Sequence, residues 1–156
     1  MQKFINTGIK LTESDIMDVS KSMNLKFPKD LVELYIQYNG SKIEGEKYFY
    51  IDEDNDVDIS VKLFLPMKYK QCENDILLEE LYQSLAVEKK LIPLSYIPFA
   101  IDDGGYPYCI NANDDKIYIG YLEDYDGSPE STIRFISDSL IKFIYGMKTE
   151  DEAYNL

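Results

Sequence analysis

The amino-acid sequence predicts an α+β fold whose sheet is mainly antiparallel, with about five or six strands. Apolar residues recur at helical spacing towards both ends of the chain, and β-branched and aromatic segments fill much of its middle. The expected strands follow one another through short turns, which is typical of antiparallel pairing. We therefore expect N-terminal helices and a C-terminal helix to pack against the sheet. The chain has 156 residues, which predicts one domain over residues 1–156 with an ordered core of about residues 11–147.

Two helices are expected in the N-terminal part. Thr12 has the position of an N-cap and Asp15 follows three residues later, so the first helix should span residues 13–23. Pro28 is tolerated at a helix start, and the apolar stripe after it predicts a second helix. The Asn-Gly pair at residues 39–40 should end this helix, because glycine readily adopts the left-handed closing conformation.

Strands and a third helix are expected next. Residues 47–51 are aromatic and β-branched, and residues 57–65 alternate apolar with polar side chains, so each segment predicts a strand. The acidic run between them indicates a solvated loop. Residues 74–89 predict a helix by their apolar spacing. Its expected buried side consists of Ile76, Leu77, Leu81, Leu85 and Val87.

The remaining strands and the last helix follow from turn and cap signals. Residues 96–101 predict a strand that ends at an Asp-Asp-Gly-Gly turn, and residues 108–111 and 116–122 should pair as a hairpin. A short strand is expected at residues 132–135. Ser137 should then cap a helix, and the tail from Thr149 onwards should fray. The apolar side of this helix consists of Leu140, Ile141, Phe143, Ile144 and Met147.

The net charge of −13 restricts the partners of the chain. A nucleic-acid backbone or an anionic membrane would be repelled by most of such a surface. The charge suits solubility alone or attraction of a basic protein. The two cysteines have no motif spacing, and neither a signal peptide nor an apolar spanning segment is present, so we expect a cytoplasmic protein.

The composition also restricts the chemistry. The chain has no histidine, which excludes Ser-His-Asp and Cys-His nucleophilic sites and histidine-ligated metals. There is no glycine-rich phosphate loop. Catalysis by tyrosine, lysine or a carboxylate pair stays formally open, but no motif supports it. We expect no catalytic residue, no metal and no cofactor.

The acidic run that starts at Asp52 invites comparison with a calcium-binding loop. Its alternating carboxylates resemble the start of an EF-hand. However, the sixth position is Val57, where glycine is needed, and the twelfth is Leu63, where a bidentate glutamate is needed. A plain acidic turn is therefore the favoured interpretation, with calcium binding as a minor alternative.

Acidic residues gather in two stretches, residues 44–58 and 102–130, and tyrosines are interleaved with them. Tyrosine rings supply contact area and carboxylates pair with Lys or Arg, so such stretches favour protein recognition. Tyr106 and Tyr125, in expected loops, should be exposed. The predicted partner-binding residues are Asp52, Glu53, Asp54, Asp56, Asp102, Asp103, Tyr106, Glu123, Asp124, Tyr125 and Asp126.

Three stretches of the chain resemble the SUKH superfamily. The first is Leu-Lys-Phe-Pro at residues 25–28 followed by the Asn-Gly turn, and the second is Pro-Phe-Ala-Ile-Asp-Asp-Gly-Gly at residues 98–105 with the strand after it. The third is Phe-Ile-Ser at residues 135–137 with the following helix. Members often carry a second glycine after Asn-Gly, where this chain has Ser41.

The resemblance implies helices packed around a sheet and a role in protein binding. Bacterial members are largely immunity proteins that bind and neutralise a cognate secreted polymorphic toxin, often a nuclease. Fungal relatives regulate cell-wall synthesis through protein contacts. The family has no catalytic motif to transfer, and its signature residues are structural. We therefore expect an immunity protein that blocks a basic toxin with its acidic surface. The alternatives are a regulatory scaffold with an endogenous partner and a small-molecule binder.

Overall fold

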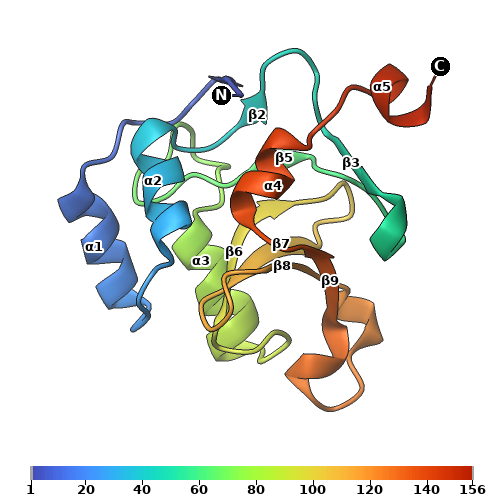
Figure 1. Cartoon of the computed structure of the whole chain (residues 1–156). Coiled ribbons are helices and arrows are strands. Elements are labelled where there is room, and N and C mark those ends of the chain that lie inside the picture. Colours follow the sequence, from blue (N-terminus) through green and yellow to red (C-terminus); the bar gives the residue numbers. More distant parts are fainter. Residues whose placement is uncertain (1, 156) are drawn as a thin grey trace.

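The computed structural model describes residues 2–155 and has a five-stranded antiparallel sheet at its centre (Figure 1). Each strand of this sheet pairs with the next one along the chain, so the predicted antiparallel α+β architecture is confirmed. The strands are β5 (Leu63–Phe64), β6 (Tyr96–Ile101), β7 (Pro107–Asn111), β8 (Ile117–Gly120) and β9 (Ile133–Ser137).

Two smaller antiparallel sheets flank the central one. The first joins β1 (Phe4–Ile5) to β2 (Lys42–Ile43), and the second joins β3 (Phe49–Asp52) to β4 (Val57–Ser60). The single strand predicted over residues 57–65 was wrong, because this segment divides between two sheets. The backbone N–H of Val61 still bonds Tyr48, whereas that of Lys62 bonds Ile101 of the central sheet. The chain therefore changes sheets between these two residues.

The N-terminal helices form as expected. α1 (Glu13–Ser22) begins with a complete capping box, in which Asp15 N–H donates to Thr12 Oγ1 over 3.1 Å and Thr12 N–H donates to Asp15 Oδ2 over 2.9 Å. α2 (Lys29–Gln37) follows Pro28. Gly40 then takes a φ of +95°, the conformation that the Asn-Gly pair predicts.

The third helix is shorter at its start than predicted. α3 (Leu78–Tyr82) begins at Leu78 and not at residue 74. The preceding turn is held by the Asp75 carboxylate, which accepts hydrogen bonds from the N–H groups of Gln71 and Cys72. A π-helical segment, Gln83–Glu88, continues it. The wider turns of this segment change the helical periodicity at Ala86 and Val87. Ile76 and Val87, both predicted as buried, are exposed, while Leu78, Tyr82 and Ala86 are buried.

The C-terminal part departs from prediction at three points. Ser137 lies inside β9, and Ser139 instead caps α4 (Leu140–Tyr145) by accepting from Lys142 N–H. Ile141 of this helix is exposed, although it was predicted as buried.

The tail was predicted to fray, but it forms α5 (Glu150–Tyr154), with a capping box at Thr149. The Tyr154 ring packs edge-on against Phe49, which fixes the helix to β3. Leu156, also part of the predicted tail, and Met1 lie outside the described residues.

The core lies between the central sheet and the helices. Tyr35, Phe99, Tyr108 and Phe143 are among its largest fully buried side chains, and the Tyr35 hydroxyl donates to the Leu65 carbonyl over 2.8 Å. Figure 1 shows α1 and α2 on the left, the β3–β4 hairpin on the right and α4 between them.

Candidate protein-interaction surface

Two acidic loops meet at one edge of the central sheet. Residues 102–106 follow β6, and residues 121–126 follow β8. Because β7 lies between these strands, β6 and β8 run in the same direction and end at the same edge. The rings of Tyr106 and Tyr121 join the loops edge-to-face, with centroids 5.7 Å apart. We call residues 102–106 and 121–126 the acidic sheet edge.

Hydrogen bonds give two of the predicted site residues a structural role. Asp102 Oδ1 accepts from Gly104 N–H over 2.9 Å and from Tyr106 N–H over 2.8 Å, so this carboxylate shapes the turn. Hydrogen bonding to Glu123 and, secondarily, burial raise the pKa of Tyr106 to about 12. A tyrosine hydroxyl is protonated near neutral pH even at its ordinary pKa, so this shift leaves Tyr106 uncharged there as before.

The exposed part of the sheet edge lies mainly in the second loop. Tyr125 is 41% exposed, as predicted, whereas Tyr106 is half-buried against the core, so its predicted exposure was wrong. Asp124 forms an ion pair with Arg134 over 3.0 Å. The exposed predicted residues of this edge are Asp103, Glu123, Asp124, Tyr125 and Asp126.

The third acidic segment forms the tip of the β3–β4 hairpin. Glu53–Asn55 makes a 3-10 turn between the strands. Asp52 accepts from the Asn55 side chain over 2.8 Å and lies 4.0 Å from Lys142 Nζ. The Asn55 hydrogen bond and the Lys142 charge lower the pKa of the Asp52 carboxyl. Glu53, Asp54 and Asp56 are exposed. We call residues 52–56 the acidic hairpin tip.

The hairpin contacts both C-terminal helices. Besides the pair between Asp52 and Lys142 of α4, the Tyr154 hydroxyl of α5 donates to Asp58 over 2.8 Å. The structure therefore brings the two sheet-edge loops together through Tyr106 and Tyr121, and Lys142 of α4 links the hairpin tip to α4. The predicted site residues form two surfaces.

Neither surface holds an evident metal cluster. Among residues 2–155, no three Asp, Glu, Cys or His side chains converge as metal ligands would. Cys72 is exposed and Cys109 is buried, and burial raises the pKa of the Cys109 thiol. Over the same residues, no helix has the length and apolar character needed to cross a membrane.

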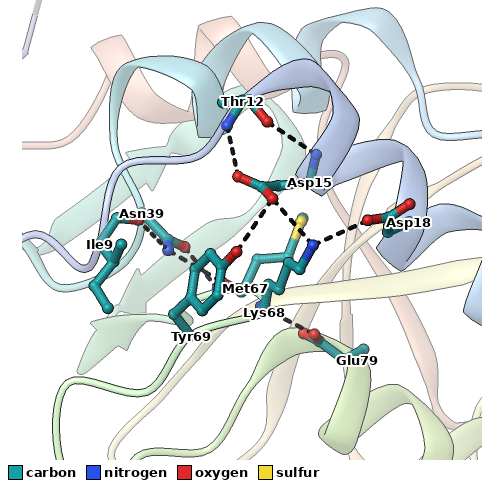
Figure 2. Close-up of polar contacts among 9 residues, drawn as sticks. All are labelled: Ile9, Thr12, Asp15, Asp18, Asn39, Met67, Lys68, Tyr69 and Glu79. Atoms are coloured by element: carbon teal, nitrogen blue, oxygen red, sulfur yellow. Dashed lines mark hydrogen bonds and ion pairs between the residues drawn. The ribbon is translucent and has the colours of Figure 1, made fainter.

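A network of polar contacts ties α1 to the loop before α3 (Figure 2). Lys68 Nζ lies 3.0 Å from both Asp15 and Asp18, and the Tyr69 hydroxyl donates to Asp15. The hydrogen bond from Thr12 N–H, followed by that from Lys68, lowers the pKa of Asp15 to about 2. Lys68 also holds a positive φ of +65°, which these contacts stabilise.

Asn39 and Glu79 extend this network into the interior (Figure 2). The buried Asn39 amide donates to the carbonyls of Ile9 and Met67 over 2.8 and 3.0 Å and accepts from Met67 N–H. Glu79 accepts from Lys68 N–H over 2.9 Å, and burial raises its pKa. We call Thr12, Asp15, Asp18, Asn39, Lys68, Tyr69 and Glu79 the polar network.

Comparison with known proteins identifies the family. The sequence model of the SMI1 / KNR4 family (SUKH-1) matches residues 10–146. The chain belongs to this family. No curated protein matches the sequence. The SMI1/KNR4 match contains all three stretches that resemble the SUKH superfamily, so that resemblance is confirmed.

One residue of the stretches that resemble the SUKH superfamily belongs to the polar network. Asn39 comes from the Asn-Gly turn of the first stretch, and sequence reasoning assigned it only the end of α2. Ser41, which stands where members often have glycine, has a φ of +93°. This conformation favours glycine, so the backbone at Ser41 is strained. The sequence signal for this feature was the second glycine that SUKH members often carry after Asn-Gly, where this chain has Ser41.

Proposed function

We propose that this SMI1/KNR4-family chain is a cytoplasmic immunity protein. It binds a cognate secreted polymorphic toxin, a basic nuclease, and covers the surface with which the toxin holds nucleic-acid phosphates. SMI1/KNR4-family membership is consistent with immunity and regulatory roles, and SUKH proteins typically bind protein partners. Because SUKH members are generally non-enzymatic, we assign the chain a binding role.

The observation that carries this proposal is the exposure of unpaired carboxylates beside tyrosine rings. In residues 2–155, the ion pairs formed by the acidic hairpin tip and sheet edge are those of Asp52 and Asp124. The other exposed carboxylates of these surfaces are available to cations of a partner. On a chain with a net charge of −13, they create a field that attracts a basic protein.

Attraction and retention have different physical origins in this proposal. Long-range attraction raises the association rate, to on the order of 10⁸ M⁻¹s⁻¹ at low salt in favourable cases. Desolvated apolar and aromatic contacts slow dissociation, since most differences in affinity between related complexes arise in the dissociation rate. Fast capture suits a protein that must block a toxin before it acts.

A regulatory scaffold with an endogenous partner is the second candidate. SMI1/KNR4-family membership is consistent with it, because that family includes regulators. The gene neighbourhood discriminates between the two functions. A toxin gene beside the gene of this chain favours immunity, and its absence favours regulation.

Measurement of binding kinetics across salt concentrations tests the proposal. The probe is the toxin domain encoded beside this chain, and the variant carries Glu53→Gln, Asp54→Asn and Asp56→Asn together. We expect its association rate to fall about tenfold at low salt and to depend less on ionic strength, because the variant loses steering charge. The variant should also protect cells less well against the toxin.

A control with the same change in net charge isolates the hairpin tip. It carries Glu13→Gln, Glu73→Gln and Glu88→Gln, at exposed positions outside both acidic surfaces. We expect a much smaller fall in association rate for this control. Equal effects of the two variants, or an association rate indifferent to salt, would contradict the proposed role of the hairpin tip.

A further inference from the structure

A groove of about 470 Å³ lies between α2, α4 and the N-terminal segment. Its apolar lining includes Phe4, Leu34, Tyr38, Leu140 and Ile144. Phe4 stacks on Tyr38, which fixes β1 as one wall of the groove. The groove therefore lies between well-packed elements, and its volume falls in the range of binding pockets, about 300–1,000 Å³.

Two large apolar side chains of α4 stand at the mouth of the groove. Ile141 is 50% exposed and Tyr145 is 48% exposed, and both line the groove. Exposed large apolar side chains that gather in a patch mark interaction sites, and Tyr is enriched among the energetic hot spots of protein interfaces. A small ligand inside the groove would leave much of these two side chains in water. The occupant that fits them is a protein segment.

The groove and the acidic hairpin tip lie on opposite flanks of α4. On the hairpin flank, Phe143 packs against Tyr50 with ring centroids 5.1 Å apart, and Lys142 lies 4.0 Å from Asp52. Ile141 and Tyr145 face the groove. Figure 1 shows α4 between α2 and the hairpin, so one partner can contact both flanks.

Two acidic side chains and one basic side chain line the groove. Asp30 and Glu33 of α2 line it, and Lys29 lies 3.7 Å from Glu33. Lys3 lines the groove as well. The acidic hairpin tip adds further carboxylates across α4. Carboxylates at the α2 side and at the hairpin tip therefore flank an apolar centre.

We propose that this groove receives an apolar side chain of a basic partner protein. Lys or Arg residues on either side of that anchor meet Asp30 at α2 and the acidic hairpin tip beyond α4. This inference rests on the proposed function, because it assigns the partner of that function a second contact. The hairpin tip accelerates association, and the groove slows dissociation.

Kinetics with matched neutral variants test the groove. The groove variant carries Ile141→Ser and Tyr145→Ser, which remove apolar area without changing charge. The control carries Leu94→Ser and Met17→Ser, at positions that are 60% and 54% exposed and do not line the groove. With the neighbouring toxin domain as probe, we expect the groove variant to dissociate at least about tenfold faster, at an unchanged association rate. Unchanged dissociation, or the same change in the control, overturns the inference.

Selection of short random peptides on the immobilised protein gives a readout that does not need the toxin. We expect selected peptides to carry a large apolar residue beside Lys or Arg, and to bind the control but not the groove variant. The inference is overturned if the selected peptides lack Lys and Arg, or if they bind the groove variant as tightly as the wild-type protein. If such peptides bind the groove while the toxin domain does not bind the protein, the groove inference stands and the proposed function fails.

Sedimentation of the protein alone tests the competing occupant. If the wild-type protein dimerises and the groove variant is a monomer, a second copy fills the groove and the inference is overturned. A monomeric wild-type protein supports a heterologous partner. Melting temperatures of both variants verify that their folds are intact, since all four positions are exposed.

Discussion

The polar network and the acidic hairpin tip both contain carboxylate side chains, but these carboxylates have different roles. In the polar network, Asp15 receives a hydrogen bond from Thr12 N–H, another from the Tyr69 hydroxyl and an ion pair from Lys68. At the hairpin tip, Glu53 and Asp54 are exposed. A carboxylate with several partners inside the chain fixes the fold, and one without them is free for an external cation.

The density of carboxylates in the sequence therefore does not distinguish these two roles. Asp15 and Asp18 lie in an acidic stretch of α1, much as Asp54 and Asp56 lie in the acidic hairpin tip. The difference comes from Lys68, which is distant in sequence and reaches α1 through the loop before α3. Substitutions in the polar network should therefore change stability, and substitutions at the acidic hairpin tip should change association.

The largest expected effect is on stability and comes from the polar network. Asn39→Ala removes the side chain that satisfies Met67 N–H and two carbonyls in the interior. Buried polar groups without partners cost about 1–3 kcal/mol each, so we expect the free energy of unfolding to fall by about 3 kcal/mol. Denaturant unfolding measures this loss. Asn113→Ala, in an exposed turn, is the matched control, and a loss as small as in this control would contradict the role of Asn39.

The second effect concerns acid stability. The folded pKa of Asp15 is about 2, below its ordinary value of 3.8. The stabilisation from Asp15 is therefore fully present above pH 3.8 and is lost as pH falls towards 2. We expect Asp15→Asn to unfold more readily than wild type at neutral pH, and the difference to shrink across this window. Denaturant unfolding at several pH values measures it, with Asp54→Asn as the control, and a difference independent of pH would count against the network.

Local signals predicted much of the fold. The capping box at Thr12 and the strand at residues 96–101 depend on neighbours in sequence, and both formed where expected. The strand predicted over residues 57–65 failed, because the backbone contacts of Val61 and Lys62 with Tyr48 and Ile101 decide sheet membership. These contacts require the assembled fold, which no local pattern describes.

The candidate surfaces were predictable in composition but not in arrangement. β6 and β8 end together because β7 lies between them in the antiparallel sheet. The half-burial of Tyr106 depends on its packing against Tyr121 in the other loop. The exposure of Ile141 had no sequence signal, since its spacing suits the apolar side of a helix. Ser139, two residues beyond the predicted cap, sets the start of α4.

A smaller effect on stability is expected at the turn after α2. Ser41 has a φ of +93° and no side chain is needed to keep its backbone bonds to Phe64, which are both 2.8 Å long. Glycine removes strain of about 1–3 kcal/mol but costs about 0.5–1 kcal/mol of conformational entropy. We therefore expect Ser41→Gly to stabilise the protein by about 1 kcal/mol, measured as a higher melting temperature. A lower melting temperature would show that the serine is not strained there.

The smallest effect on stability is expected at the acidic hairpin tip. The variant with Glu53→Gln, Asp54→Asn and Asp56→Asn removes exposed carboxylates, and surface substitutions of this kind change stability by about 0.5 kcal/mol or less. Repulsion within the tip also falls, so any shift should be towards higher stability at low salt. Denaturant unfolding at low and high salt measures the change in stability and its dependence on salt. A large destabilisation would mean that these carboxylates hold the hairpin together, and the slower association expected of this variant would then reflect a damaged fold and not lost attraction.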